Sequence, residues 1–119
     1  DFCSGWYIKE LSGLAMIADW DEEYFESNLH MKFHHQDEIR QREEPFEASY
    51  CGFGFTKVAS SIIRELEYPY FRQRMVTIGD HSENCSEDVT FCLDVWEKCG
   101  IKPTILPQLR VNHLKEMYI

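Results

Sequence analysis

The clearest secondary-structure signal in the chain is the stretch S-E-D-V-T-F-C-L-D-V-W-E-K-C-G, residues 86–100. Its apolar side chains recur at the spacing of one helical face: Val89, Cys92, Trp96 and Cys99. Ser86 is a residue type that caps helix N-termini, and Gly100 is the type that most often ends a helix. The stretch therefore predicts a helix that begins after Ser86 and ends before Gly100.

Two acidic residues lie in the first turn of this predicted helix. At about 100° per residue, Asp88 falls in the arc of Cys92, Val95 and Cys99, whereas Glu87 points away from it. One interpretation is that both carboxylates only complement the helix dipole. The other uses the inward direction of Asp88, because a carboxylate on a rigid helix start beside a cleft can accept a proton from a substrate hydroxyl.

Strand-like and helix-like segments alternate along the rest of the chain. Residues 2–9 and 14–18 are aromatic, β-branched and apolar around a turn, which predicts a hairpin. Residues 46–58 have strand character, and residues 59–66 have helical composition. The alternation indicates an α/β protein with a mixed β-sheet and flanking helices.

Three further segments carry weaker signals. Residues 21–47 are strongly charged, which favours a solvated helix or a long excursion ended by Pro45. Residues 79–86 have the composition of a polar loop. Residues 101–106 and 109–114 predict two short strands separated by Pro107.

The composition excludes some classes of partner. With 119 residues, the chain has the length of a single domain, residues 1–119. Its net charge of -9 repels phosphate backbones and anionic lipid heads, so we expect neither nucleic acid nor a membrane as a partner. Five cysteines without a CxxC pair favour reduced thiols in the cytoplasm over a disulfide framework.

The beginning of the chain suggests a fragment. Asp1 leads directly into a strand-like segment, and the chain begins without a methionine. We therefore expect the native polypeptide to begin further upstream.

Two glycines flank Phe53 inside a strand-like run. Gly52 and Gly54 mark either a bulge or a point where another backbone or a ligand comes close. A bulged strand turning into the next helix and a wall that faces a substrate are both open at this point.

One histidine near the C-terminus shares a strand face with apolar residues. By the two-residue period, His113 lies in line with Leu109 and Val111. It is either a core residue with a satisfied hydrogen bond or a ligand to a divalent metal.

Two other groups have ligand-type side chains. Asp19 and Asp21 imitate a carboxylate pair that binds a metal-diphosphate, although a solvated turn is the simpler account. His30 and His34 are four residues apart and would meet on a helix, but no third ligand completes a zinc-like spacing, so surface positions are favoured.

Several short motifs follow one another in a recognisable order. They are Y-C-G-F-G-F-T at residues 50–56, Y-P-Y-F-R at 68–72, E-D-V-T-F-C-L at 87–93 and L-R-V-N-H at 109–113. This order resembles the C-terminal, acceptor-side half of nucleotide-sugar glycosyltransferases of the GT-A type, in particular the family 2 enzymes. The opening S-G-W-Y-I-K is similar to the strand that follows the donor-binding half in such proteins, so the resemblance covers nearly the whole chain.

The resemblance implies a role for each matched residue. Asp88 matches the catalytic base of inverting members, and Glu87 matches its acidic companion. Gly52, Phe53 and Gly54 match the strand that borders the acceptor, and His113 matches a position that completes the metal site. The implied reaction transfers a sugar from a nucleotide-sugar donor to an acceptor hydroxyl, with Mn²⁺ or Mg²⁺ as cofactor.

The chain departs from the family in one respect. Such enzymes carry a nucleotide-binding half upstream that ends in a D-x-D motif, and Asp19 and Asp21 follow the S-G-W-Y strand where that motif precedes it. We therefore expect the chain alone to be inactive. The alternative is a non-catalytic interaction domain that keeps the half-fold and self-associates as a homo-oligomer through an exposed sheet edge.

Overall fold

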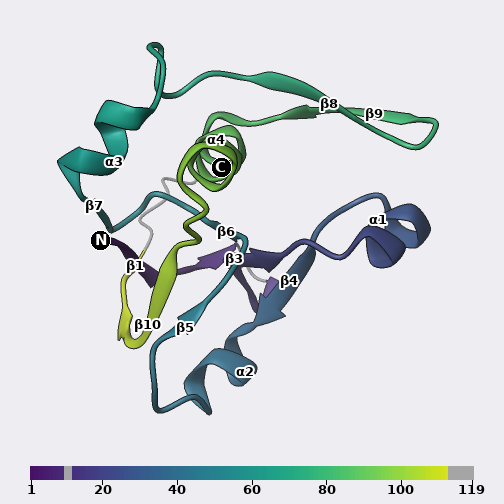
Figure 1. The fold of residues 1–119 in the computed structure, drawn as a ribbon. Helices are drawn as coiled ribbons and strands as arrows, with labels where there is room; N and C mark the ends of the chain where they lie inside the picture. Colours follow the sequence, from purple (N-terminus) through teal and green to yellow (C-terminus); the bar gives the residue numbers. More distant parts are fainter. Residues whose placement is uncertain (10–11, 113–119) are drawn as a thin grey trace, which may run out of the picture.

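The computed structural model describes residues 1–9 and 12–112, and over this range the chain is a mixed α/β protein (Figure 1). The helices are α1 (Glu22–Asn28), α2 (Gln36–Arg40), α3 (Ser60–Glu65) and α4 (Glu87–Cys99). The strands before α3 are β1 (Phe2–Trp6), β2 (Ile8–Lys9), β3 (Leu14–Asp19), β4 (Lys32–His35), β5 (Phe46–Glu47), β6 (Tyr50–Cys51) and β7 (Thr56–Val58). Those after α3 are β8 (Arg74–Ile78), β9 (His81–Cys85) and β10 (Thr104–Arg110).

The described strands form mixed and antiparallel sheets rather than the single mixed sheet expected. One sheet has the order β5-β10-β1-β7, in which β1 runs parallel to β10 and antiparallel to β7. A second sheet contains β2, β3 and β4, with β6 also paired to β3. The first residues of the chain pass from one sheet to the other, so residues 2–9 hold the two sheets together.

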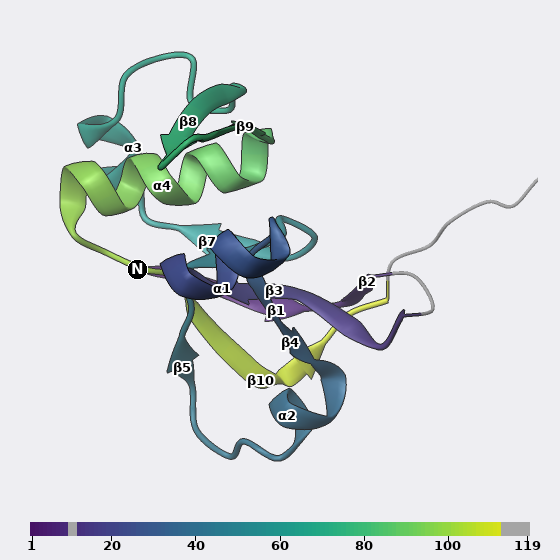
Figure 2. The ribbon, with the colours of Figure 1, turned by 90° about the vertical axis from the view of Figure 1, so that its right-hand side faces the viewer.

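Helix α4 lies between these sheets and an antiparallel hairpin of β8 and β9 (Figure 2). It packs against β6 and α3. Its buried face carries Thr90, Phe91, Cys92 and Val95. The core is a continuous apolar cluster that joins this face to β1, β3 and β10.

The predicted helix is confirmed with its boundaries. Residue Ser86 precedes α4 with extended backbone angles, and Gly100 follows it with a φ of 67°, the left-handed conformation that glycine adopts without steric cost. The predicted helix over residues 59–66 is α3. The predicted hairpin is confirmed where β2 pairs with β3, whereas β1 pairs elsewhere.

Three segments differ from their predictions. Residues 21–47 contain β4 between α1 and α2, followed by β5, and residues 79–86 contain β9 instead of a loop. Residues 101–106 and 109–114 were expected to form two strands, but β10 runs through Pro107, and residues 113–114 lie outside the described residues. It does so because the register with β1 shifts from Ser4↔Ile105 to Trp6↔Arg110, which places Pro107 in a bulge where no ladder N–H is needed.

In the described part of the chain, no helix combines the length and the apolar character needed to cross a lipid bilayer.

Candidate functional site

The carboxylate of Asp88 contacts the glycine-flanked segment. Asp88 is half-buried in the first turn of α4, whereas Glu87 is exposed. The backbone N–H of Phe53 donates a hydrogen bond to Asp88 Oδ2 at 3.4 Å. The fold thus brings together two groups of predicted site residues that are 35 positions apart in sequence.

The two glycines accommodate the ring of Tyr7. A Cβ atom on Gly52 would collide with Tyr7 Oη, and one on Gly54 would lie 2.6 Å from Tyr7 Cε1. These positions therefore need glycine because an aromatic ring covers the backbone. The close approach is made by a side chain of the chain itself, and it leaves open whether the segment also borders a substrate.

Two tyrosine side chains share the surroundings of Asp88. Burial, and then the charge of Asp88, raises the pKa of Tyr7. The same two causes, in the same order, raise the pKa of Tyr50, which is 4% exposed. Both phenols therefore stay protonated at neutral pH and can donate hydrogen bonds.

Sequence reasoning did not select either tyrosine. Tyr7 lies 45 or more positions before the glycines, so its contact with them depends on how the residue between β1 and β2 meets the turn between β6 and β7. A local signal existed for Tyr50, which lies on the strand immediately before Gly52. Gly52 and Gly54 lie in the turn between β6 and β7, and no local signal pointed to Tyr7.

We expect Gly54→Ala to lower the free energy of unfolding by about 1–3 kcal/mol, because the new methyl group overlaps the Tyr7 ring. Urea unfolding of the wild type and the variant measures the loss. Combined with Tyr7→Ala, the same glycine substitution should cost much less. An equal loss in both backgrounds would show that the ring is not the obstacle.

A cavity of about 800 Å³ opens beside this site. Its walls come from α4, from the hairpin β8–β9 and from the segment that contains α1 and β4. Ser86 and Val89, the residues on either side of Glu87 and Asp88, both line the cavity, as does Tyr50. The cavity therefore extends to the first turn of α4.

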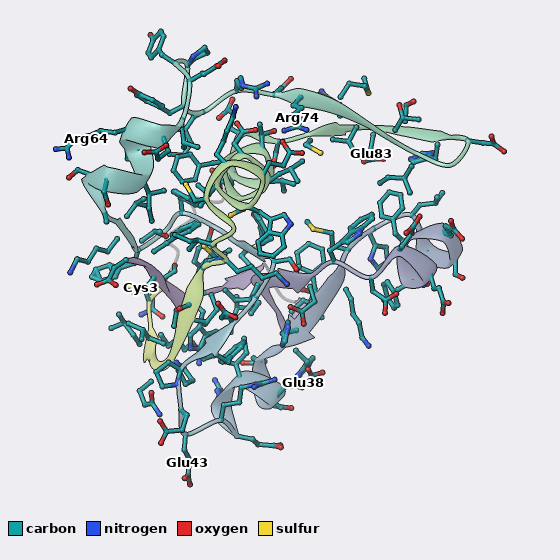
Figure 3. The ribbon with its side chains drawn as sticks, in the orientation of Figure 1. Cys3, Glu38, Glu43, Arg64, Arg74 and Glu83 are labelled. Carbon is teal, nitrogen blue, oxygen red and sulfur yellow. The ribbon has the colours of Figure 1, made fainter. Side chains whose placement is uncertain are left out.

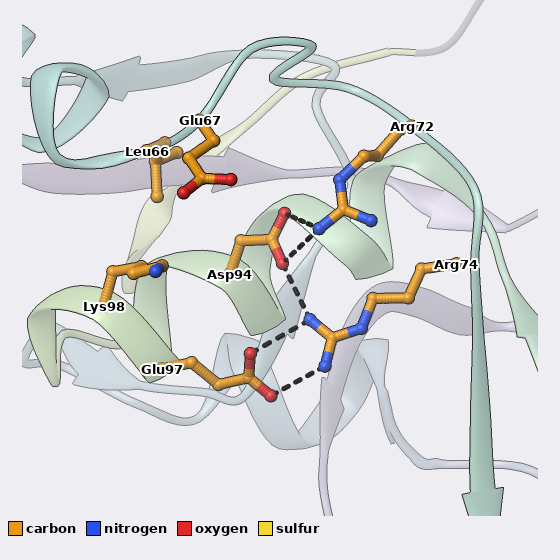
Figure 4. Close-up of a pocket in the computed structure, with 7 residues that line it drawn as sticks. All are labelled: Leu66, Glu67, Arg72, Arg74, Asp94, Glu97 and Lys98. Atoms are coloured by element: carbon orange, nitrogen blue, oxygen red, sulfur yellow. Dashed lines mark hydrogen bonds and ion pairs between the residues drawn. The ribbon is translucent and has the colours of Figure 1, made fainter.

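An ion-pair cluster ties the hairpin to α4 (Figure 4). Arg74 at the start of β8 donates hydrogen bonds to Asp94 at 2.8 Å and to Glu97 at 2.8 and 3.0 Å. Arg72 adds two contacts of 3.2 Å to Asp94. Figure 3 shows Arg74 on the strand beside α4, and these bonds hold the hairpin wall of the cavity in place.

Asp19 and His34 form a second polar pair away from α4. His34 is buried, and its Nε2 lies 2.7 Å from Asp19 Oδ2. Its Nδ1 is buried without a hydrogen-bond partner among the described residues, and the nearest carboxylate oxygen, on Glu38, is 3.8 Å away. The expected surface position of His34 is therefore wrong, and it lies on β4 rather than on a helix with His30.

The hydrogen bond with His34 lowers the pKa of Asp19, against the opposing effect of burial. A carboxyl group with a lowered pKa in the folded state stabilises the protein at any pH above its pKa in the unfolded chain, about 4. This stabilisation is lost as the pH falls from there through the folded-state pKa.

We expect Asp19→Asn to be destabilising near neutral pH and less so near pH 3. Urea unfolding midpoints of the wild type and Asp19→Asn between pH 3 and pH 7 test this prediction, and Asp80→Asn, at an exposed position, is the control. A difference between wild type and Asp19→Asn that does not change with pH would contradict the prediction.

The metal site implied by the resemblance gains no support from the described residues. His113 lies outside the described residues. Within residues 1–9 and 12–112, no group of three His, Cys, Asp or Glu side chains is placed to hold a metal ion. Asp21, the partner of Asp19 in the carboxylate pair, instead accepts a hydrogen bond from the Tyr24 N–H at 3.1 Å and caps α1.

Comparisons of the chain with models of protein families, with curated proteins and with solved structures found no match.

Proposed function

We propose that the chain is the acceptor-side half of a GT-A type glycosyltransferase and that Asp88 is its general base. The observation that carries the proposal is the contact of Asp88 with the Gly52–Gly54 segment at the start of α4, beside a large cavity. The motif order that suggests this family links the same two segments. Their contact in space is what a shared acceptor site requires.

The chemistry of this arrangement is a displacement at a sugar carbon. Asp88 accepts the proton of the acceptor hydroxyl while the oxygen of that hydroxyl attacks the anomeric carbon of the sugar. The bond from the anomeric carbon to the nucleoside diphosphate breaks at the same time. The Phe53 N–H orients the carboxylate through its hydrogen bond. Burial and the Asp88 charge raise the pKa of Tyr7 and Tyr50, so these neighbouring phenols do not compete for the proton.

The proposed enzyme uses a divalent metal ion as cofactor and acts in the cytoplasm. Mn²⁺ or Mg²⁺ would bind in the complete enzyme and stabilise the departing diphosphate. The described residues offer no ligand cluster for it. All five cysteines are free thiols, which fits a reducing compartment such as the cytoplasm.

The test is a sugar-transfer screen on the polypeptide that contains this chain. UDP- and GDP-sugars are incubated with a mixture of hydroxyl acceptors and Mn²⁺, and mass spectrometry detects glycosylated products. Products that need the nucleotide-sugar support the proposal. Without transfer from any donor, and with a stable dimer in sedimentation, the self-associating interaction domain would be the better account.

A further inference from the structure

The cavity beside α4 has the size and lining of a small-molecule site. Its volume of about 800 Å³ lies within the range of roughly 300–1,000 Å³ that such sites occupy. Its lining residues come from three sides: Phe25 and Phe33 from α1 and β4, Val76 and Ile78 from β8, and Leu93 from α4. Walls on several sides of an open cavity suit a small ligand, whereas a protein partner needs a broad flat face.

The side chains at the rim define the polarity of the occupant. Trp20 and Trp96 line the cavity and are 44% and 49% exposed, so two indole rings belong both to its lining and to the molecular surface. Large half-exposed indoles offer flat apolar surface to a ring system. The occupant therefore has an apolar body that includes a ring.

The charged groups of the cavity already have partners in the protein. Glu83 lies 2.7 Å from His81 Nε2, and Glu97 is held by Arg74. Lys102 Nζ lies 5.0 Å from the centre of the Trp96 ring. The two carboxylates are thus held by basic side chains, Lys102 lies over an indole ring, and apart from these groups and His30 the lining is uncharged, so the cavity favours a neutral molecule.

One end of the cavity lies next to the proposed base, although Asp88 itself is not among the lining residues. Ser86, Val89 and Tyr50 line it, and Tyr50 is close enough to Asp88 for the carboxylate to raise its pKa. A ligand that fills the apolar part can therefore place a hydroxyl group at the start of α4.

We propose that this cavity binds the acceptor, and that the acceptor is a neutral alcohol with an apolar, ring-containing body rather than a free sugar. The naming of the occupant as acceptor rests on the proposed function. The capacity of the cavity to bind such a molecule rests only on its size, lining and charge.

Binding can be measured without catalysis. The neutral probe N-phenyl-1-naphthylamine fluoresces in apolar surroundings, and we expect one saturable site per chain. Val76→Trp places an indole inside the cavity and should weaken binding at least tenfold. Met75→Trp makes the same change at the next residue of β8, which is 63% exposed, and should leave binding unchanged.

A second wall variant and a displacement series complete the experiment. Ile78→Trp should repeat the effect of Val76→Trp, with far-ultraviolet circular dichroism confirming that both variants fold. 2-Naphthol, a neutral aromatic alcohol, should displace the probe, and methyl glucoside should not. The proposal is overturned if the wild type shows no saturable binding, if Met75→Trp weakens binding as much as Val76→Trp, or if methyl glucoside displaces the probe equally well.

The same measurements separate this inference from the proposed function. If the protein binds the probe in the cavity but transfers no sugar, the cavity is a binding site and its occupant is not an acceptor. A protein that transfers sugar equally well with a filled cavity, in Val76→Trp, would keep the proposed function and contradict the cavity as the acceptor site.

Discussion

Replacing Asp88 with asparagine is expected to lower kcat for sugar transfer by about 10²- to 10⁴-fold, the range that a positioned general base contributes. The amide cannot accept the proton of the acceptor hydroxyl at neutral pH. It keeps the size of the carboxylate and an oxygen that can accept the hydrogen bond from the Phe53 N–H. The loss should therefore appear in the rate and leave the fold intact.

Initial rates of the polypeptide that contains this chain are paired with thermal unfolding for Asp88→Asn and Glu87→Gln. Glu87 matches the acidic companion of the base rather than the base itself, and it is exposed, so its variant should lose much less rate than Asp88→Asn. If Asp88→Asn loses stability and keeps its rate, Asp88 has only a structural role in holding α4 to the Phe53 segment. If both variants lose rate equally, the inward direction of Asp88 is not what matters.

The part of this site that lies on α4 could be predicted because its signals are local. The spacing of apolar residues, Ser86 before the helix and Gly100 after it are all within one short stretch, and helix geometry then gives the direction of Asp88. The neighbours of Asp88 could not be predicted in the same way. Tyr7 and the glycine segment meet only when strands distant in sequence are brought together.

The hairpin wall of the cavity was missed for a different physical reason. Strand β9 has the sequence H-S-E-N-C, which is polar at most positions and typical of a loop. It is a strand because β8 supplies partners for its backbone along its whole length, from Arg74↔Cys85 to Ile78↔His81. Most of its side chains are exposed, so no apolar alternation was available to indicate it.

Replacing Phe91 with alanine is expected to lower the free energy of unfolding by about 3–5 kcal/mol, as is usual when a fully buried aromatic ring is removed. Phe91 is completely buried on α4. Its ring stacks on Phe71 with centroids 4.7 Å apart, and it packs edge-on to Phe53 at 5.1 Å and to Phe2 at 6.0 Å. The substitution thus removes packing that holds α4 to β1 and to the glycine-flanked segment.

Urea unfolding of Phe91→Ala and of Phe55→Ala makes the comparison, because both variants remove the same side chain. Phe55 is 53% exposed, so its loss should cost under about 1 kcal/mol. Small domains are stable by only about 5–15 kcal/mol, and Phe91→Ala should therefore unfold at a much lower urea concentration. Since Phe53 contacts both Phe91 and Asp88, Phe91→Ala should also disturb the position of the Asp88 carboxylate. Equal losses of stability in Phe91→Ala and Phe55→Ala would contradict a core organised around Phe91.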